Sequence, residues 1–160
     1  MKYLLCLVVL NFSLVNLFAQ KETYDLATFT PPKGWVKELK INSHTSYSII
    51  DKKTKSYCQI FIMSSTASKG GINEDFDSEW QTLVAKQYGV TVAPKMTEPS
   101  TEDGWQMKGG MAPFTFNKGT STAMLTTISG YHKTVSIVSV TNNTDYLPAI
   151  QALLESVEMS

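Results

Sequence analysis

The segment SYCQIFIM, residues 56–63, decides the fold of this 160-residue chain because it places apolar side chains on both faces of one strand. Successive side chains of a strand point to opposite faces of its sheet. The apolar residues here are Cys58, Ile60 and Ile62 on one face and Tyr57, Phe61 and Met63 on the other. Such a two-sided pattern is typical of a strand that is covered on both faces. We therefore predict a central strand between helical layers.

Two amphipathic helices are predicted to supply this cover. After a small polar loop at residues 64–71, Asn73 is placed to cap the first helix, and Gly89 ends it. The apolar stripe of this helix is Phe76, Trp80, Leu83, Val84 and Tyr88. The second helix is predicted to open at Thr144 or Asp145. Its apolar stripe is Leu147, Ile150, Leu153, Leu154 and Val157.

The rest of the chain predicts further strands. They are expected at residues 24–30, 35–39, 45–50, 90–96, 105–108, 111–116, 121–129 and 134–140. Short turns join several of them, including a charged hairpin loop at residues 51–55 and a bend or bulge at Gly109 and Gly110. Strands joined by short turns pair in antiparallel fashion. The expected fold class is α+β, an antiparallel β-sheet flanked by helices in an α/β/α sandwich, with residues 20–160 as a single domain.

Residues 1–19 have the layout of a cleavable signal peptide. Lys2 precedes an apolar run at residues 3–15, and a more polar stretch then ends at Ala19. Polar residues interrupt this run, whereas a membrane-spanning helix needs about 20 mostly apolar residues. We therefore expect cleavage near Ala19 and export to the periplasm or the medium, with no stable membrane span afterwards.

The charge of the mature chain argues against nucleic acid as a partner. Without Lys2, the chain carries 13 Lys against 14 Asp and Glu, and it contains no Arg. A nearly neutral surface offers no electrostatic attraction to nucleic acid or to an anionic membrane. The lack of guanidinium groups also removes bidentate recognition of phosphate.

No constellation of residues predicts catalysis or a metal site. His44 and His132 are the two histidines, and neither has the spacing of a metal-binding motif. The sequence has no GxSxG motif and no glycine-rich phosphate loop. Capping of the helix start explains the adjacent Glu74 and Asp75, and Cys58 is predicted to be a small buried hydrophobe. We predict a non-enzymatic protein with no catalytic residue, cofactor or metal, and a hydrolase with dispersed carboxylates is the least favoured alternative.

Surface recognition is the function class that remains. Loops on a rigid scaffold carry binding more often than cores do, so the candidate contact edges are residues 64–73 and 98–104. The candidate binding residues are Trp35, Trp105, Ser68, Lys69, Glu102 and Asp103. For the two tryptophans a position in the core is the favoured alternative. The expected partner is a protein.

A carrier of a small apolar ligand is the alternative hypothesis. A cavity between sheet and helix, lined by Tyr57, Phe61, Trp80 and Met124, would hold the ligand. A pocket on the order of several hundred Å³ with convergent polar groups favours this hypothesis. A flat, exposed aromatic patch favours the protein-binding hypothesis instead.

The order of the elements resembles that of a known superfamily. Phe29, Pro32, Gly34 and Trp35 come early, and the last helix ends with residues 153–157, Leu-Leu-Glu-Ser-Val. With the strand pair, the acidic helix start and the antiparallel strands between them, residues 24–157 resemble the Mog1/PsbP-like superfamily. This resemblance implies an antiparallel sheet between helices and a non-catalytic role, since members mostly bind proteins such as photosystem subunits, a small GTPase or secretion effectors. The chain lacks the acidic cluster and the manganese-related features of one branch, so the resemblance implies no particular partner.

Overall fold

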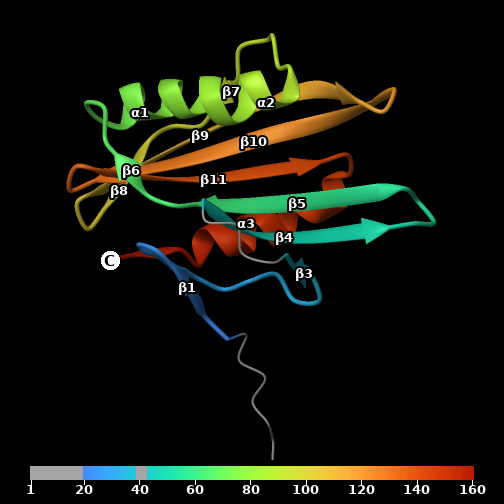
Figure 1. Ribbon diagram of the computed structural model, residues 1–160, viewed down its shortest axis with the longest axis horizontal. Coiled ribbons are helices and arrows are strands. Elements are labelled where there is room, and N and C mark those ends of the chain that lie inside the picture. Colours follow the sequence, from blue (N-terminus) through green and yellow to red (C-terminus); the bar gives the residue numbers. More distant parts are fainter. Residues whose placement is uncertain (1–19, 39–42) are drawn as a thin grey trace, which may run out of the picture.

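Helical layers lie on the two faces of a large antiparallel sheet in the computed structural model, which describes residues 20–38 and 43–160 (Figure 1). The segment of α1 and α2 packs on one face, and α3 packs on the other together with a small second sheet. The predicted α+β fold with an antiparallel sheet is therefore confirmed. The predicted signal peptide, residues 1–19, lies outside the described residues.

The large sheet follows the order β3-β4-β5-β11-β10-β9-β7 within the described ranges, with β6 paired to β11 and β8 paired to β9. Every pairing in it is antiparallel. Its strands are β3 (Val36–Lys37), β4 (His44–Asp51), β5 (Ser56–Met63), β6 (Thr66–Ala67), β7 (Lys95–Met96), β8 (Ser100–Glu102), β9 (Trp105–Phe116), β10 (Gly119–Gly130) and β11 (Lys133–Thr141). The charged loop predicted at residues 51–55 joins β4 to β5.

β5 lies inside the sheet between β4 and β11, as its two-sided pattern predicts. Its two faces are covered unequally. Cys58, Ile60 and Ile62 are fully buried on the α3 side, whereas Tyr57 and Phe61 are only half-buried on the α1 side. The sheet therefore has one closed face and one face that is partly open.

The helical segment on the open face runs from α1 (Ile72–Glu79) through a π-helical turn, η1 (Trp80–Ala85), into α2 (Lys86–Tyr88). Its main packing contacts with the sheet are to β9 and β10, while Tyr57 and Phe61 of β5 border the same apolar cluster. Gly89 ends the segment in the left-handed conformation at φ 66°, as predicted. The predicted cap is wrong, because Gly71 occupies the N-cap position and the Asn73 Oδ1 atom accepts a hydrogen bond from Lys108 Nζ at 2.8 Å. None of the helices in the described ranges is long and apolar enough to cross a membrane.

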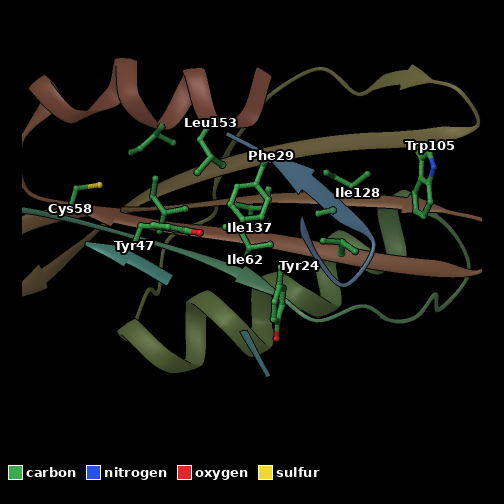
Figure 2. Packing of buried hydrophobic residues seen from close by; sticks show 13 residues of the cluster. Tyr24, Phe29, Tyr47, Cys58, Ile62, Trp105, Ile128, Ile137 and Leu153 are labelled. Carbon is green, nitrogen blue, oxygen red and sulfur yellow. The ribbon is translucent and has the colours of Figure 1, made fainter. Parts of the chain in front are cut away.

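The closed face is covered by α3 (Leu147–Glu155), which follows the short 3-10 helix η2 (Thr144–Tyr146). Asn143 caps this helical region one residue before the predicted start, because its Oδ1 atom accepts a hydrogen bond from Asp145 N at 3.0 Å. Figure 2 shows Leu153 of α3 and Phe29 gathered with Ile137 of β11 in the core on this side. Apolar side chains of α3 and of the small second sheet thus pack together against β5 and β11.

The strand predicted at residues 24–30 is a hairpin. β1 (Glu22–Tyr24) pairs with β2 (Ala27–Phe29), and Asp25 turns the chain between them at φ 52°. β12 (Glu158–Met159) adds to the outer side of β2 and forms the small three-stranded sheet. The propensity of residues 24–30 for extended structure hid this turn, since Asp tolerates the left-handed conformation almost as Asn does.

β9 continues without a break through Gly109 and Gly110, where the sequence predicts a bend or bulge. The two glycines serve close packing instead. A Cβ atom on Gly110 would lie 2.7 Å from Phe76 Cζ, so the ring of Phe76 rests directly on the strand backbone. Glycine inside a strand is typical of such a close approach.

Candidate functional site

An apolar groove opens on the α1 side of the sheet, where the helical segment ends and leaves β5 uncovered. Its volume is about 520 Å³, and its lining residues are Ile50, Asp51, Lys52, Lys55, Tyr57, Gln59, Tyr88, Phe114, Phe116 and Val140. A second hollow of about 270 Å³ shares Tyr88 with it and is lined by His44, Phe61, Met63, Leu83, Gln87 and Val138. We call the first of these the Tyr88 groove and the second the His44 hollow. The larger volume lies within the range of pockets that bind small molecules.

Four aromatic rings shape the Tyr88 groove. Tyr57 meets Phe116 edge to face, with ring centroids 5.9 Å apart, and Tyr88 meets Phe114 at 5.1 Å. The Tyr57 hydroxyl shares a hydrogen bond with Ser121 Oγ at 2.8 Å, which fixes that ring. Phe116 and Ile50 stand half exposed or more at the mouth, at 50% and 67%. Burial raises the pKa of Tyr88, with a further rise from Tyr57, so the Tyr88 phenol stays neutral at ordinary pH.

The turn between β4 and β5 forms the one charged end of the groove. The Asp51 carboxylate accepts hydrogen bonds from Lys53 N at 2.8 Å and Thr54 N at 3.4 Å. These bonds, the one from Lys53 N foremost, lower the pKa of Asp51 and tie its charge to the turn backbone. Lys52 and Lys55 both line the groove beside it. The groove therefore joins an apolar interior to two exposed lysines at its rim.

Asn142, just after β11, attaches this turn to the sheet. Its Nδ2 atom donates to Lys55 O at 3.0 Å, and its Oδ1 atom accepts from Tyr57 N at 2.8 Å. The Asn142 side chain thereby links the β4–β5 turn to Tyr57 in the groove. The lysines are presented by an anchored turn rather than by a free loop.

Of the cavity residues predicted from the sequence, Tyr57 lines the Tyr88 groove and Phe61 lines the His44 hollow. Trp80 is only 4% exposed and stacks on Phe76 at 5.8 Å, so it belongs to the core. Met124 packs on the α3 side, the opposite face of the sheet. The residues missed were Ile50, Tyr88, Phe114, Phe116 and the two lysines. The sequence signal that could have identified part of this set is an apolar residue at a strand end directly beside a polar turn, as at Ile50 and Phe116.

The other predicted binding residues lie at the opposite end of the sheet or in the core. Ser68 and Lys69 share a hollow of about 450 Å³ with Gly104, while Glu102 and Asp103 line a smaller one of about 160 Å³ with Trp105. The two predicted contact edges thus meet at one end of the molecule. Trp105 is 9% exposed, in line with the favoured core position, whereas Trp35 is half-buried at the edge of the core and packs edge to face on Tyr146 at 6.0 Å.

A polar cluster lies beneath the start of α1, where the sequence predicts only capping. Asp75 is 2% exposed, and its carboxylate accepts hydrogen bonds from Ser68 Oγ at 2.7 Å, Lys69 N at 2.5 Å and Thr134 Oγ1 at 2.7 Å. Burial acts to raise the pKa of Asp75, but these hydrogen bonds outweigh it and lower the pKa. One helical turn later, burial raises the pKa of Glu79. Ser68 and Lys69 therefore anchor the loop to the helix.

The histidines and the cysteine are not grouped with these carboxylates. His44 begins β4 and is half-buried, with its ring 5.4 Å from that of Phe61. His132 lies exposed in the β10–β11 turn. Cys58 is fully buried, as predicted, and burial raises its pKa to about 12. In the part of the chain that the structure describes, no three His, Cys, Asp or Glu side chains gather as metal ligands.

Comparison with known proteins gives a likeness of fold. No protein-family model and no curated protein matches the sequence. A solved structure from Bacteroides thetaiotaomicron VPI-5482 is similar with a TM-score of 0.54 and 12% identity over 89% of this chain. This chain spans 48% of that one, about half its length. The resemblance to the Mog1/PsbP-like superfamily stays a prediction.

A second similar structure comes from another bacterium. LpqN of Mycobacterium tuberculosis, described as involved in cell envelope biogenesis, matches with a TM-score of 0.51 and 8% identity. The match covers 84% of this chain and 83% of LpqN. At such identities the likeness concerns the fold alone.

Proposed function

We propose that this chain is an exported, non-catalytic binding protein of the cell envelope that holds an apolar ligand in the Tyr88 groove. The observation that carries the proposal is the groove itself, about 520 Å³ in volume and lined by four aromatic rings. Ligand pockets are mostly apolar with a few polar groups that fix orientation. The signal-like residues 1–19 and the similarity to LpqN support a place in the envelope.

A protein partner is the second candidate. The observation that favours it is the exposure of Ile50 and Phe116 at the mouth of the same groove. Exposed apolar side chains that cluster at one place are typical of docking surfaces. An apolar side chain of a partner would then occupy the groove in place of a small molecule.

Binding of a neutral fluorescent probe separates the two candidates. The exported protein is titrated with N-phenyl-1-naphthylamine, whose fluorescence rises in apolar sites. We expect saturable binding that Phe116→Ala weakens by about tenfold, because loss of the ring removes apolar contact area from the bound probe. Val92→Ala, which truncates another exposed apolar residue outside the groove, is the matched control and is expected to bind as the wild type does.

Probe binding that neither variant changes would reject the groove as the site. Failure of the wild type to bind the probe, together with an envelope protein retained by the wild type and lost by Phe116→Ala, would favour the second candidate.

A further inference from the structure

We propose that the ligand of the Tyr88 groove is a single-chain amphiphile with a carboxylate head, its alkyl chain in the groove and its head at Lys52 and Lys55. This inference rests on the proposed function and names the class of ligand. Its basis is the one-sided distribution of charge along the groove. The seven lining residues outside the β4–β5 turn carry no charge, and they are Ile50, Tyr57, Gln59, Tyr88, Phe114, Phe116 and Val140.

The rim lysines are available to a ligand. Among the described residues the ion pairs are Lys21 with Glu158 and Lys37 with Glu22, so Lys52 and Lys55 take part in none. The chain as a whole has equal numbers of acidic and basic groups, so its overall composition does not explain an excess of lysine at one end of the groove. An apolar interior with cations at one end complements a molecule that is apolar along its length and anionic at one end.

The balance of charge at the rim indicates a monoanion. Two lysines and Asp51 line that end of the groove, which leaves one net positive charge. Because two backbone N–H groups already bind the Asp51 carboxylate, it does not compete for the lysine ammonium groups as a free anion would. A carboxylate matches this single charge, and lysine can bind it as a point charge without the forked geometry of arginine.

The shape of the open face indicates a chain. From the lysine end, the Tyr88 groove leads to Tyr88, which also lines the His44 hollow beyond it. The lining residues of that hollow include Phe61, Met63 and Leu83, which continue the apolar surface. A compact ring system would fill only one of these spaces, whereas an alkyl chain that passes Tyr88 would reach the apolar side chains of both.

The test measures three probes with unbranched alkyl chains of nearly equal length and different heads: decanoate, decan-1-ol and decyltrimethylammonium. Each competes with N-phenyl-1-naphthylamine on the exported protein at pH 8, in low salt and below the concentration at which the probes form micelles. We expect decanoate to bind about fivefold more tightly than decan-1-ol, which is the effect of two exposed lysines on one anion. The cation should bind more weakly than the alcohol. Each methylene added to the carboxylate series should strengthen binding by about fourfold while the chain still finds apolar surface.

Paired lysine variants identify the rim. The double variant Lys52→Gln and Lys55→Gln should make decanoate and decan-1-ol equal without changing the affinity for the alcohol. The double variant Lys95→Gln and Lys118→Gln removes the same net charge from exposed residues outside the groove and should retain the fivefold preference.

Each result of this test decides one claim. Equal binding of decanoate and decan-1-ol by the wild type would overturn the carboxylate assignment and leave the proposed function standing. Failure of all three probes to displace the dye, or failure of the dye to bind, would reject the proposed function itself. Binding to vesicles of anionic lipid without binding to monomeric decanoate would also overturn the assignment, because it would identify a membrane surface in place of one amphiphile.

Discussion

Phe76 rests on Gly110 so closely that a Cβ atom at Gly110 would stand 2.7 Å from Phe76 Cζ. This contact places α1 over β9, and the helix then extends through η1 to Tyr88. Because the helix lies over β9 and β10, the part of β5 around Tyr57 stays partly open. The position of the groove is thus linked to one glycine of β9, the strand that also carries Phe114 and Phe116.

Gly110→Ala is expected to lower the free energy of unfolding by about 1–3 kcal/mol, because the buried ring of Phe76 has no room to move aside. Urea denaturation measures the change. Gly119→Ala is the matched control, since a Cβ atom there makes only ordinary contact, 3.5 Å from Phe116 O. Equal stability of the two variants would show that Phe76 is not held against the strand.

The same contact shows how far sequence reasoning reaches. The segment at residues 56–63 predicts a buried strand correctly, because alternation and β-branched side chains are local signals. From the sequence alone, Gly110 is compatible with either a bend in the strand or a close approach of another element to its backbone, because both use glycine in a strand. The contact with Phe76 distinguishes these two possibilities. Phe76 belongs to the helical layer, so the sequence pattern around Gly110 carries no information about this contact.

The sequence predicts only part of the candidate site, because pairing across the sheet decides which other residues join it. Tyr57 and Phe61 were identified because their strand pattern places them on one face. Met124 was assigned to the wrong face because the orientation of β10 relative to the helix depends on pairing across the whole sheet. The two-residue β12 was missed, since it exists through its pairing with β2 rather than through propensity.

Asp75→Asn should destabilise the protein by about 1–3 kcal/mol at pH 7, because the donors of Ser68, Lys69 and Thr134 lose their charged acceptor. The pKa of Asp75 is lowered in the folded state, so its stabilising contribution is present above the unfolded value of 3.8. This contribution is lost as the pH falls through the folded pKa. Denaturant midpoints between pH 6 and pH 2 check the prediction. Asp77→Asn, an exposed residue of the same helix, is the control, and an identical acid dependence in the two variants would contradict the role of Asp75.

Glu79→Gln should have the opposite effect at neutral pH. Burial raises the pKa of Glu79 in the folded state above its ordinary value of 4.5, so the ionised form costs stability as the pH rises from the unfolded pKa through the folded one. The variant should therefore be more stable than the wild type at pH 8 and closer to it at pH 4. The groups that face Glu79 are Ser136, Lys69 and Asp75, and the comparison of Glu79→Gln with Glu74→Gln, at an exposed position, isolates burial from net charge.

Cys58 should not react with a thiol reagent in the native protein at pH 8. The side chain is fully buried, and burial raises its pKa to about 12, so both access and thiolate are lacking. Unfolding in guanidinium should release one thiol per exported chain. Release of a second thiol would show that Cys6, and with it the predicted signal peptide, remains attached. Rapid labelling without denaturant would contradict the closed packing of the α3 face.

Ile50→Glu should reduce the preference of the groove for an anion from about fivefold to less than twofold while leaving the fold intact. Ile50 is 67% exposed on β4, so a glutamate there costs little stability, yet it adds a negative charge inside the mouth beside Lys52. We expect the affinity for decanoate to fall by about tenfold and that for decan-1-ol by about threefold, since the neutral probe loses apolar contact alone. Val36→Glu changes an equally exposed residue, 65%, on the neighbouring strand β3 outside the groove, and it should bind both probes as the wild type does. Equal losses for the two probes in Ile50→Glu would place the anionic head away from this mouth.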